Sequence, residues 1–334
     1  MKSIPLNLTA YAIVTIVLLC WGMERVHAAD KAPPKVEKIV MASPFAPLVM
    51  PMAHILEAGL LKDVCEKAEL RTWNTPDQLR AMITRGDVDF ISLPSNVAAI
   101  FYNKGVPLTL ARVSIWGVFY LISNEPSVTS LAQLKGKRIF VPFRGDQPDL
   151  LLQTICRAQG LEPFTDFTIQ YVSSPLDITM SLLAGKVDHA LMIEPAAAMA
   201  IMKAKGKGLD FKRVIDLQKE YEKTMDSGIK GVPNAGIAVL PAIKDNKPLV
   251  NAFLTAYDQS VQWTNEHPKE ASELAARYIH GVNAKAFEEA LQYTDFRSVS
   301  GKDSRKALEL MFNKFMEMNP KSIGGKLPDA GLYQ

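Results

Sequence analysis

Two segments of the chain share one pattern of apolar and polar positions. Residues 70–91 read LRTWNTPDQLRAMITRGDVDFI, and residues 169–190 read IQYVSSPLDITMSLLAGKVDHA. Each begins with an alternating stretch typical of a strand and continues with apolar residues three and four apart, as in a helix. A hydroxyl residue and a proline precede each helix, and a glycine follows it, which are signals for a helix start and end. The copies align without a gap, matching Thr75-Pro76 with Ser174-Pro175, Leu79 with Ile178, Ile83 with Leu182, Gly86 with Gly185, Val88 with Val187, and Asp89 with Asp188.

Each copy therefore predicts a strand–helix–strand unit in an α/β fold. The two strands of a unit are expected to be parallel, because a crossover that carries a helix is how parallel strands are connected. The shared spacing favours a duplicated unit over its alternative, a chance similarity between two ordinary units with favoured capping residues.

The rest of the pattern predicts an ordered series of strands and helices. Further strands are expected at 38–42, 108–113, 117–123, 137–142 and 236–241, and helices at about 50–62, 93–104, 130–136 and 149–159. From Lys247 onward the pattern is helical, with Leu249, Phe253, Tyr257 and Val261 on one apolar stripe. The strands at 117–123 and 236–241 are expected to carry the chain from one lobe to a second and back.

The first 28 residues resemble a secretory signal peptide. Lys2 supplies a positive charge, residues 10–22 are almost wholly apolar, and Val26-His27-Ala28 precedes the expected cleavage site. Two alternatives are an uncleaved membrane anchor, for which the apolar run is short, and lipid attachment at Cys20, which lacks the usual small residue before it. We expect an exported, periplasmic protein that is cleaved near Ala28.

Length, charge and cysteine content narrow the class of protein. Cleavage would leave 306 residues, more than one compact core usually holds, so two lobes are expected. The formal net charge of +3 is too close to neutral to indicate a nucleic-acid partner. Cys65 and Cys156 lie in different halves of the chain, and we expect both to be buried thiols.

No catalytic, metal or cofactor motif stands out in the sequence. There is no Gly-x-Ser-x-Gly, phosphate loop, Cys-x-x-Cys or His-Glu-x-x-His, and the histidines are scattered singly. We therefore expect no cofactor and no metal, and a binding protein rather than an enzyme.

The order of elements resembles the substrate-binding proteins of nitrate-, sulfonate- and taurine-type ABC importers. The resemblance rests on SLAQLKGKRIFVPF, LLAGKVDHALMIEPAAA, GDVDFISLPSNVAAIFYNKG and LVNAFLTAYDQSVQWTNEHPKEA. It implies a two-lobed periplasmic-binding-protein fold of type II, with a mainly parallel sheet flanked by helices in each lobe and two crossing hinge strands. Lobe I would comprise 36–114 and 235–334, lobe II would comprise 115–234, and the hinges would lie at 114–118 and 232–236.

The same resemblance implies a monomer that captures a small organic solute, anionic or zwitterionic, and delivers it to a membrane permease. Two alternatives remain open: an enzyme of this fold acting on a pyrimidine-like precursor, and an accessory protein that senses a solute. The sequence lacks the cysteine-rich motif of the enzymes, and it does not separate transport from sensing.

The ligand is expected beyond the carboxyl ends of the parallel strands, where helix N-termini present free N–H groups. The candidate ligand-binding residues are Ser43, Pro44, Phe45, Trp73, Asn74, Thr75, Ser95, Asn96, Trp116, Arg144, Gln147, Ser173, Ser174 and Glu194.

Several of these candidates have a structural alternative. Thr75 and Ser174 are also expected helix caps, and the aromatic residues are also candidates for the core. Arg144 suits an anionic group of the solute, with an ion pair to Asp146 or Asp149 as its alternative. Glu194 suits an amine or a hydroxyl; Ile193 stands before it where the family often has an aromatic residue.

Overall fold

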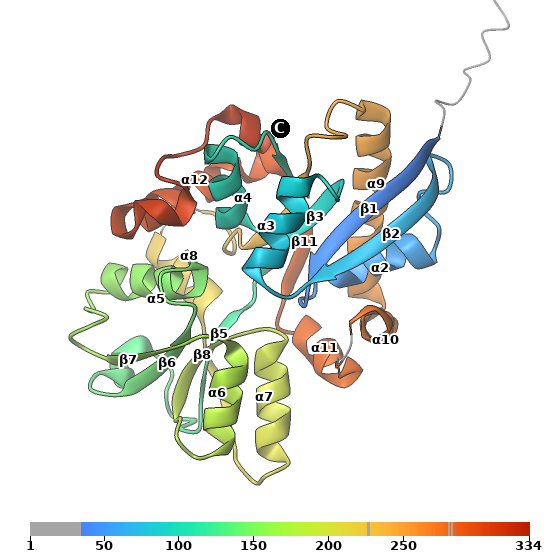
Figure 1. The fold of residues 1–334 in the computed structure, drawn as a ribbon. Helices are drawn as coiled ribbons and strands as arrows, with labels where there is room; N and C mark the ends of the chain where they lie inside the picture. The colour runs from blue at the N-terminus through green and yellow to red at the C-terminus, as the bar shows by residue number, and fades with distance from the viewer. Residues whose placement is uncertain (1–34, 226–227, 280, 282) are drawn as a thin grey trace, which may run out of the picture. The chain divides into compact units, whose positions relative to one another are not determined.

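The computed structural model describes residues 35–225, 228–279, 281 and 283–334. The expected signal peptide and Cys20 lie outside the described residues. Residues 36–334 form one compact unit that is built on two β-sheets (Figure 1).

Sheet A contains six strands in the described part of the chain, in the order β11-β4-β10-β3-β1-β2. β2 and β3 are parallel to β1, whereas β10 is antiparallel to both β3 and β4, and β11 is antiparallel to β4. The strands are β1 (Val36–Pro44), β2 (Cys65–Trp73), β3 (Phe90–Pro94), β4 (Thr109–Gly117), β10 (Ala235–Val239) and β11 (Asp295–Ser300).

Sheet B contains five strands in the described residues, in the order β7-β6-β8-β5-β9. β7 and β8 are parallel to β6, and β5 is antiparallel to β8 and β9. The strands are β5 (Phe119–Ser123), β6 (Arg138–Pro142), β7 (Thr168–Val172), β8 (His189–Ile193) and β9 (Lys212–Asp216).

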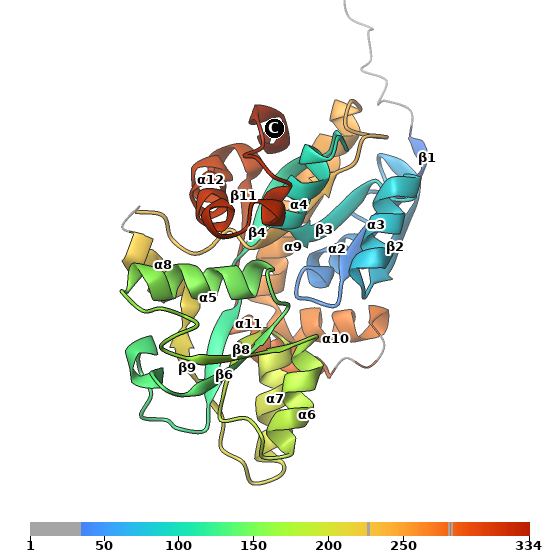
Figure 2. The ribbon, with the colours of Figure 1, turned by 60° about the vertical axis from the view of Figure 1, so that its left-hand side comes forward.

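Helices flank both sheets, and in both views α6 and α7 lie side by side along sheet B (Figures 1 and 2). The α-helices are α2 (Val49–Glu57), α3 (Pro76–Arg85), α4 (Ser95–Asn103), α5 (Gln147–Ala158), α6 (Pro175–Leu183), α7 (Ala196–Lys205), α8 (Leu217–Met225), α9 (Lys247–Glu266), α10 (Pro268–Tyr278), α11 (Ala284–Leu291) and α12 (Gly301–Met318). Short 3-10 helices are η1 (Leu131–Leu134), η2 (Pro320–Ile323) and η3 (Ala330–Tyr333).

The two sequence repeats form equivalent parts of the two sheets, as predicted. The first supplies β2, α3 and β3, and the second supplies β7, α6 and β8. In both sheets the two strands of the repeat are parallel and are separated by one earlier strand, β1 or β6. The shared spacing thus corresponds to a shared topology.

The strand that was expected over 117–123 is divided between the two sheets. β4 ends at Gly117 in sheet A and β5 begins at Phe119 in sheet B, with Val118 between them. Hydropathy does not mark the break, because the residues on both sides of it are buried. Gln218 holds the start of β5: its side chain accepts from the Phe119 N–H at 2.8 Å and donates to the Phe119 carbonyl at 3.1 Å.

The expectation of a wholly helical C-terminal region is wrong at one place. β11 runs over Asp295–Ser300 and pairs with β4 at the end of sheet A. Only Phe296 is buried in this strand, so the apolar alternation that would predict it is weak. Strand β9 and helix α8 were likewise not anticipated from the pattern.

The predicted interior residues are buried, and the core follows the sheets. Leu249, Phe253, Tyr257 and Val261 pack from α9 against sheet A, and Phe253 stacks on Phe90. Cys65 and Cys156 are both buried, as expected. No helix in the described ranges has the length and apolar character that a membrane span requires.

The strand directions bring the carboxyl ends of the strands in the two sheets next to each other. The carboxyl ends of β1, β2, β3 and β4 share one edge of sheet A, and those of β6, β7, β8 and β9 share one edge of sheet B. Because a single residue separates the end of β4 from the start of β5, these edges adjoin at the crossing. We call them the facing edges.

Candidate functional site

The facing edges hold the two equivalent helix starts of the repeat. Thr75 Oγ1 accepts from the Gln78 N–H at 3.2 Å at the start of α3, and Ser174 Oγ accepts from the Asp177 N–H at 3.3 Å at the start of α6. Ser174 also forms a reciprocal capping box with Asp177. Asn74 and Ser173 beside them are exposed. Both hydroxyl groups therefore act as helix caps, which was the structural alternative for these residues.

Replacement of Ser174 by alanine is expected to lower the free energy of unfolding by about 1 kcal/mol, because it removes the cap of α6. Urea denaturation followed by circular dichroism measures this change. Thr75→Ala is the matched variant in the other sheet, and a similar loss is expected there. A loss well below 0.5 kcal/mol in both variants would contradict the capping role, since that is about the smallest cost of such a replacement.

Residues at the end of β1 contact other side chains of the protein. Ser43 is fully buried, and its hydroxyl accepts from Ser92 Oγ at 2.9 Å. Pro44 and Phe45 are half-buried, and the Phe45 ring meets Phe287 of α11 edge to face at 5.6 Å. This end of β1 thus contacts the helix that also packs on α7.

Two tryptophans lie at the ends of strands in sheet A. Trp73 is buried, and its indole N–H has no partner among the described residues. Trp116 is also buried; its indole donates to the Val113 carbonyl at 3.2 Å, and Arg297 lies over its ring at 4.5 Å. Trp73 therefore keeps a free donor, whereas the polar atom of Trp116 is used.

A network of polar hydrogen bonds connects the two facing edges near the start of α5. Asn96 Nδ2 donates to Asp146 at 3.0 Å, and Gln147 Nε2 donates to Asn234 Oδ1 at 3.1 Å. Ser95 belongs to the same network, because its N–H donates to the Asn234 carbonyl at 2.9 Å. The structure thus brings together the predicted residues Ser95, Asn96 and Gln147, and it adds Asn234.

Arg144 lies in the loop between β6 and α5 and is exposed. Its guanidinium lies over the ring of Tyr171 at 5.1 Å. The alternative of an ion pair with Asp146 or Asp149 is not found among the described residues. Asp149 instead accepts from the Gly145 N–H, the Gln153 amide and the Tyr171 hydroxyl. The Arg144 guanidinium is therefore available to another group.

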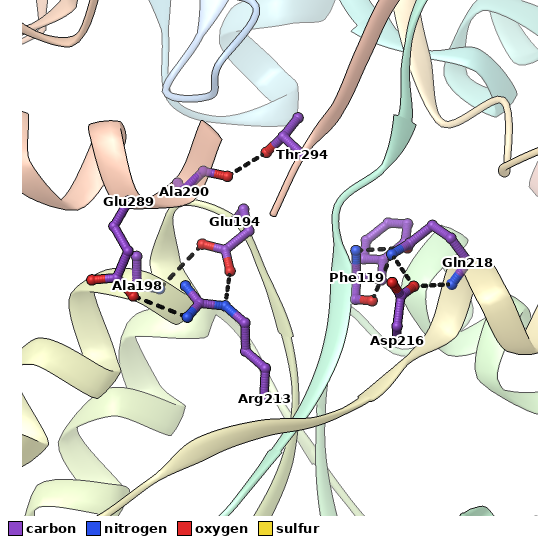
Figure 3. Close-up of polar contacts among 9 residues, drawn as sticks. All are labelled: Phe119, Glu194, Ala198, Arg213, Asp216, Gln218, Glu289, Ala290 and Thr294. Carbon is purple, nitrogen blue, oxygen red and sulfur yellow. Dashed lines mark hydrogen bonds and ion pairs between the residues drawn. The ribbon is translucent and has the colours of Figure 1, made fainter. Parts of the chain in front are cut away.

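Glu194 is buried in an ionic cluster that the sequence did not reveal. Arg213 Nε donates to Glu194 Oε1 at 2.6 Å, and the Ala198 N–H donates to Glu194 Oε2 at 3.2 Å. Arg213 Nη1 also donates to Glu289 of α11 at 2.9 Å. Figure 3 shows the guanidinium between the two carboxylates. Both oxygens of Glu194 are thus occupied by protein donors.

The burial of this cluster perturbs the ionisation of its members. Burial raises the pKa of Glu194, and the hydrogen bond and charge of Arg213 oppose that rise without cancelling it. Burial also lowers the pKa of Arg213, but the hydrogen bonds and charges of Glu194 and Glu289 outweigh burial and leave it raised. Arg213 additionally lies over the Tyr293 ring at 3.7 Å. The guanidinium therefore stabilises the buried carboxylate of Glu194 and also pairs with the partly exposed carboxylate of Glu289.

The sequence did not indicate three further candidate residues of the site: Arg213, Glu289 and Asn234. Each gains its importance from residues distant in the chain: Arg213 and Glu289 are separated by 76 positions, and Gln147 and Asn234 by 87. No local motif marks them. Position at a helix start that follows a strand, by contrast, is a local signal, and it identified Ser95, Asn96, Gln147 and Glu194.

Comparison with protein families gives a match over most of the chain. Residues 69–271 match the family described as NMT1/THI5 like, which is more than half of the 334 residues. No curated protein compared with the sequence matches it.

Several solved structures, among them the following three, have the same fold. An ABC transporter from Parabacteroides distasonis has a TM-score of 0.74 and 25% identity, covering 90% of this chain and 99% of that one. The periplasmic aliphatic sulphonate binding protein SsuA from Escherichia coli has a TM-score of 0.69 and 16% identity, covering 89% and 91%. The periplasmic nitrate-binding protein NrtA from Synechocystis PCC 6803 has a TM-score of 0.64 and 14% identity, covering 87% and 85%. These likenesses confirm the expected two-lobed periplasmic-binding-protein fold.

Proposed function

Since the chain belongs to the NMT1/THI5-like family and has this two-lobed fold, we propose that it is the solute-binding component of an ABC importer. It captures one small organic solute between two lobes outside the cytoplasm and delivers it to a membrane permease. The observation that carries the proposal is the likeness, over 90% of the chain, to the Parabacteroides distasonis ABC transporter structure. The enzyme and sensor alternatives gain no better support from the comparisons.

The lobes in this proposal are those expected from the sequence. Lobe I comprises 36–114 and 235–334, lobe II comprises 115–234, and the chain pivots at 114–118 and 232–236. The hydrogen bond from the Val232 N–H to the Trp116 carbonyl, at 2.6 Å, supports placing the two hinges side by side. We also propose that the protein is a periplasmic monomer, cleaved near Ala28 and without catalytic activity.

The solute contacts are proposed at the facing edges. Arg144 offers an available guanidinium, while Trp73, Ser95 and Asn96 offer polar atoms without a partner among the described residues. Glu194 acts through Arg213, because both of its oxygens are already bound. The remaining expected contacts are Ser43, Pro44, Phe45, Asn74, Thr75, Trp116, Gln147, Ser173 and Ser174.

A thermal-shift screen of the purified protein tests the function. The panel contains sulfonates, carboxylates, amino acids, amines and aromatic heterocycles. A true ligand at 100 times its dissociation constant is expected to add about 2.7 kcal/mol of stability. Stabilisation by one chemical class, with the compound recovered unchanged, is the expected result. No stabilisation by any class, or conversion of the compound, would contradict the proposal.

Replacement of Arg144 by alanine is expected to weaken binding of the solute by about 1.5–3 kcal/mol, the value of a hydrogen bond to a charged group. Isothermal titration of the variant with the compound found by the screen measures the loss. Arg80→Ala is the matched control, because Arg80 is an exposed arginine paired with Asp77 on α3. Unchanged affinity of Arg144→Ala for an anionic compound would exclude this contact.

A further inference from the structure

The loop between β6 and α5, residues 143–146, exposes three side chains of different chemistry. Phe143 is 39% exposed, although it is a large apolar residue, and Arg144 and Asp146 are exposed beside it. Phe143 has a φ of 58°, and it is the one non-glycine residue with positive φ in the described part of the chain. A bulky side chain is strained at positive φ, and such strain is concentrated at ligand-binding sites.

Contacts from several elements fix the backbone of this loop. The Phe143 N–H donates to the Val172 carbonyl of β7 at 3.2 Å, and the Asp146 N–H closes a turn on the Phe143 carbonyl at 3.0 Å. The Gly145 N–H donates to the buried carboxylate of Asp149 at 2.7 Å. The exposed side chains therefore project from a backbone that is held in place.

The two charges of the loop are available and do not neutralise each other. Arg144 lies against Tyr171 and has no ion pair among the described residues. Asp146 uses Oδ1 for both of its bonds, from Asn96 Nδ2 at 3.0 Å and from the Gln147 N–H at 2.8 Å. Its Oδ2 has no hydrogen-bond partner in the described ranges. The guanidinium of Arg144 and the Oδ2 atom of Asp146 are thus both available to a bound solute.

Buried polar atoms without partners adjoin the same loop. Asn96 Oδ1 and Asn234 Nδ2 have no hydrogen-bond partner among the described residues, although the two residues are 1% and 2% exposed. Asn96 is bound to Asp146, and Asn234 is bound to Gln147, the first residue of α5. Because native proteins rarely leave buried polar atoms unsatisfied, these two atoms are expected to bind a water molecule or a polar group of the solute.

We propose that this loop makes the protein selective for a zwitterionic organic solute. The anionic group of the solute binds Arg144, its ammonium group binds Asp146, and its hydrocarbon part lies on Phe143. A solute with negative charge alone would face the Asp146 carboxylate without compensation, which disfavours it. The inference rests on the proposed function and names the class of solute for the same site.

Matched pairs of probes that differ by one amine test this selectivity. The pairs are taurine and ethanesulfonate, β-alanine and propionate, and phenylalanine and 3-phenylpropanoate, each titrated calorimetrically into the full chain. In at least one pair the amine-bearing member is expected to bind about tenfold or more tightly than its partner. Asp146→Asn is expected to remove that preference, because it keeps Oδ1 for the helix cap and removes the negative charge.

Two further variants separate recognition from folding. Asp303→Asn is the matched control, because Asp303 lies in the first turn of α12, at the opposite edge of sheet A, and it is expected to leave the preference unchanged. If Asp146→Asn does not fold, Asp146→Ser retains a capping hydroxyl and replaces it in the test.

The possible outcomes are distinct. Equal or tighter binding of the amine-free members overturns the selectivity, as does an Asp146 variant that keeps the preference. If none of the pairs binds but the wider screen finds a ligand without an amine, the zwitterion inference fails and the transport proposal stands. If no compound of any class binds, both fail.

Discussion

Replacing Arg213 with methionine is expected to lower the free energy of unfolding by about 3–5 kcal/mol, the cost of removing one partner from a buried ion pair. The side chain of Glu194 is 0% exposed and that of Arg213 is 8% exposed, so water cannot replace the lost guanidinium. Methionine fills a similar volume and leaves the carboxylate without its counter-ion. Urea denaturation at pH 7, followed by circular dichroism and tryptophan fluorescence, measures the change.

Two companion variants show whether the loss arises from the unpaired charge. Glu289→Gln is expected to cost about 1 kcal/mol or less, because Glu289 is 33% exposed and the solvent screens its ion pair. The double variant Glu194→Gln with Arg213→Met is expected to recover part of the stability, since it removes the buried charge together with its partner. An Arg213→Met protein within 1 kcal/mol of the original chain would show that the cluster is not a structural requirement.

Replacement of Gly236 by alanine is expected to cost about 3 kcal/mol or more, at the upper end of what overpacking costs. Gly236 lies in β10, where the chain re-enters sheet A, and pairs with both β3 and β4. A Cβ atom there would lie 1.8 Å from the Arg112 carbonyl oxygen and 2.8 Å from Val113 Cα. Both are backbone atoms, so a side-chain rotation cannot relieve the overlap.

The matched control for this substitution is Gly206→Ala at the end of α7. The nearest atom to a Cβ at Gly206 is the Lys203 carbonyl oxygen at 3.5 Å, and its backbone is helical, so little change in stability is expected. Denaturation midpoints of the two variants in urea give the comparison. Similar midpoints for Gly236→Ala and Gly206→Ala would show that β10 can move away from β4 at low cost.

Local signals explain which parts of the fold could be predicted from the sequence. Thr75-Pro76 and Ser174-Pro175 are adjacent residues whose capping chemistry acts within one helical turn, and the structure has both caps where they were expected. The parallel strands of each repeat follow from chain connectivity. These features depend on residues that are close in sequence, which is why one sequence is enough to find them.

The partners of the site residues could not be found in this way. Glu194 was placed correctly at the end of β8, but its partner Arg213 lies 19 positions later in a strand with no apolar alternation, and Glu289 belongs to α11. Similarly, the chain passes at Val118 from β4 of sheet A to β5 of sheet B, and both strands are buried. Packing between distant segments decides both features, and hydropathy does not encode it.

Isothermal titration of the purified chain with the compound found by the screen tests the proposal of a solute receptor. We expect about one molecule bound per chain, recovered chemically unchanged, with affinity reduced about tenfold or more in Arg144→Ala. Conversion of the compound, or binding that does not change when the facing edges are altered by Arg144→Ala, Asp146→Asn and Asn234→Asp, would contradict a receptor that holds its solute between the two sheets.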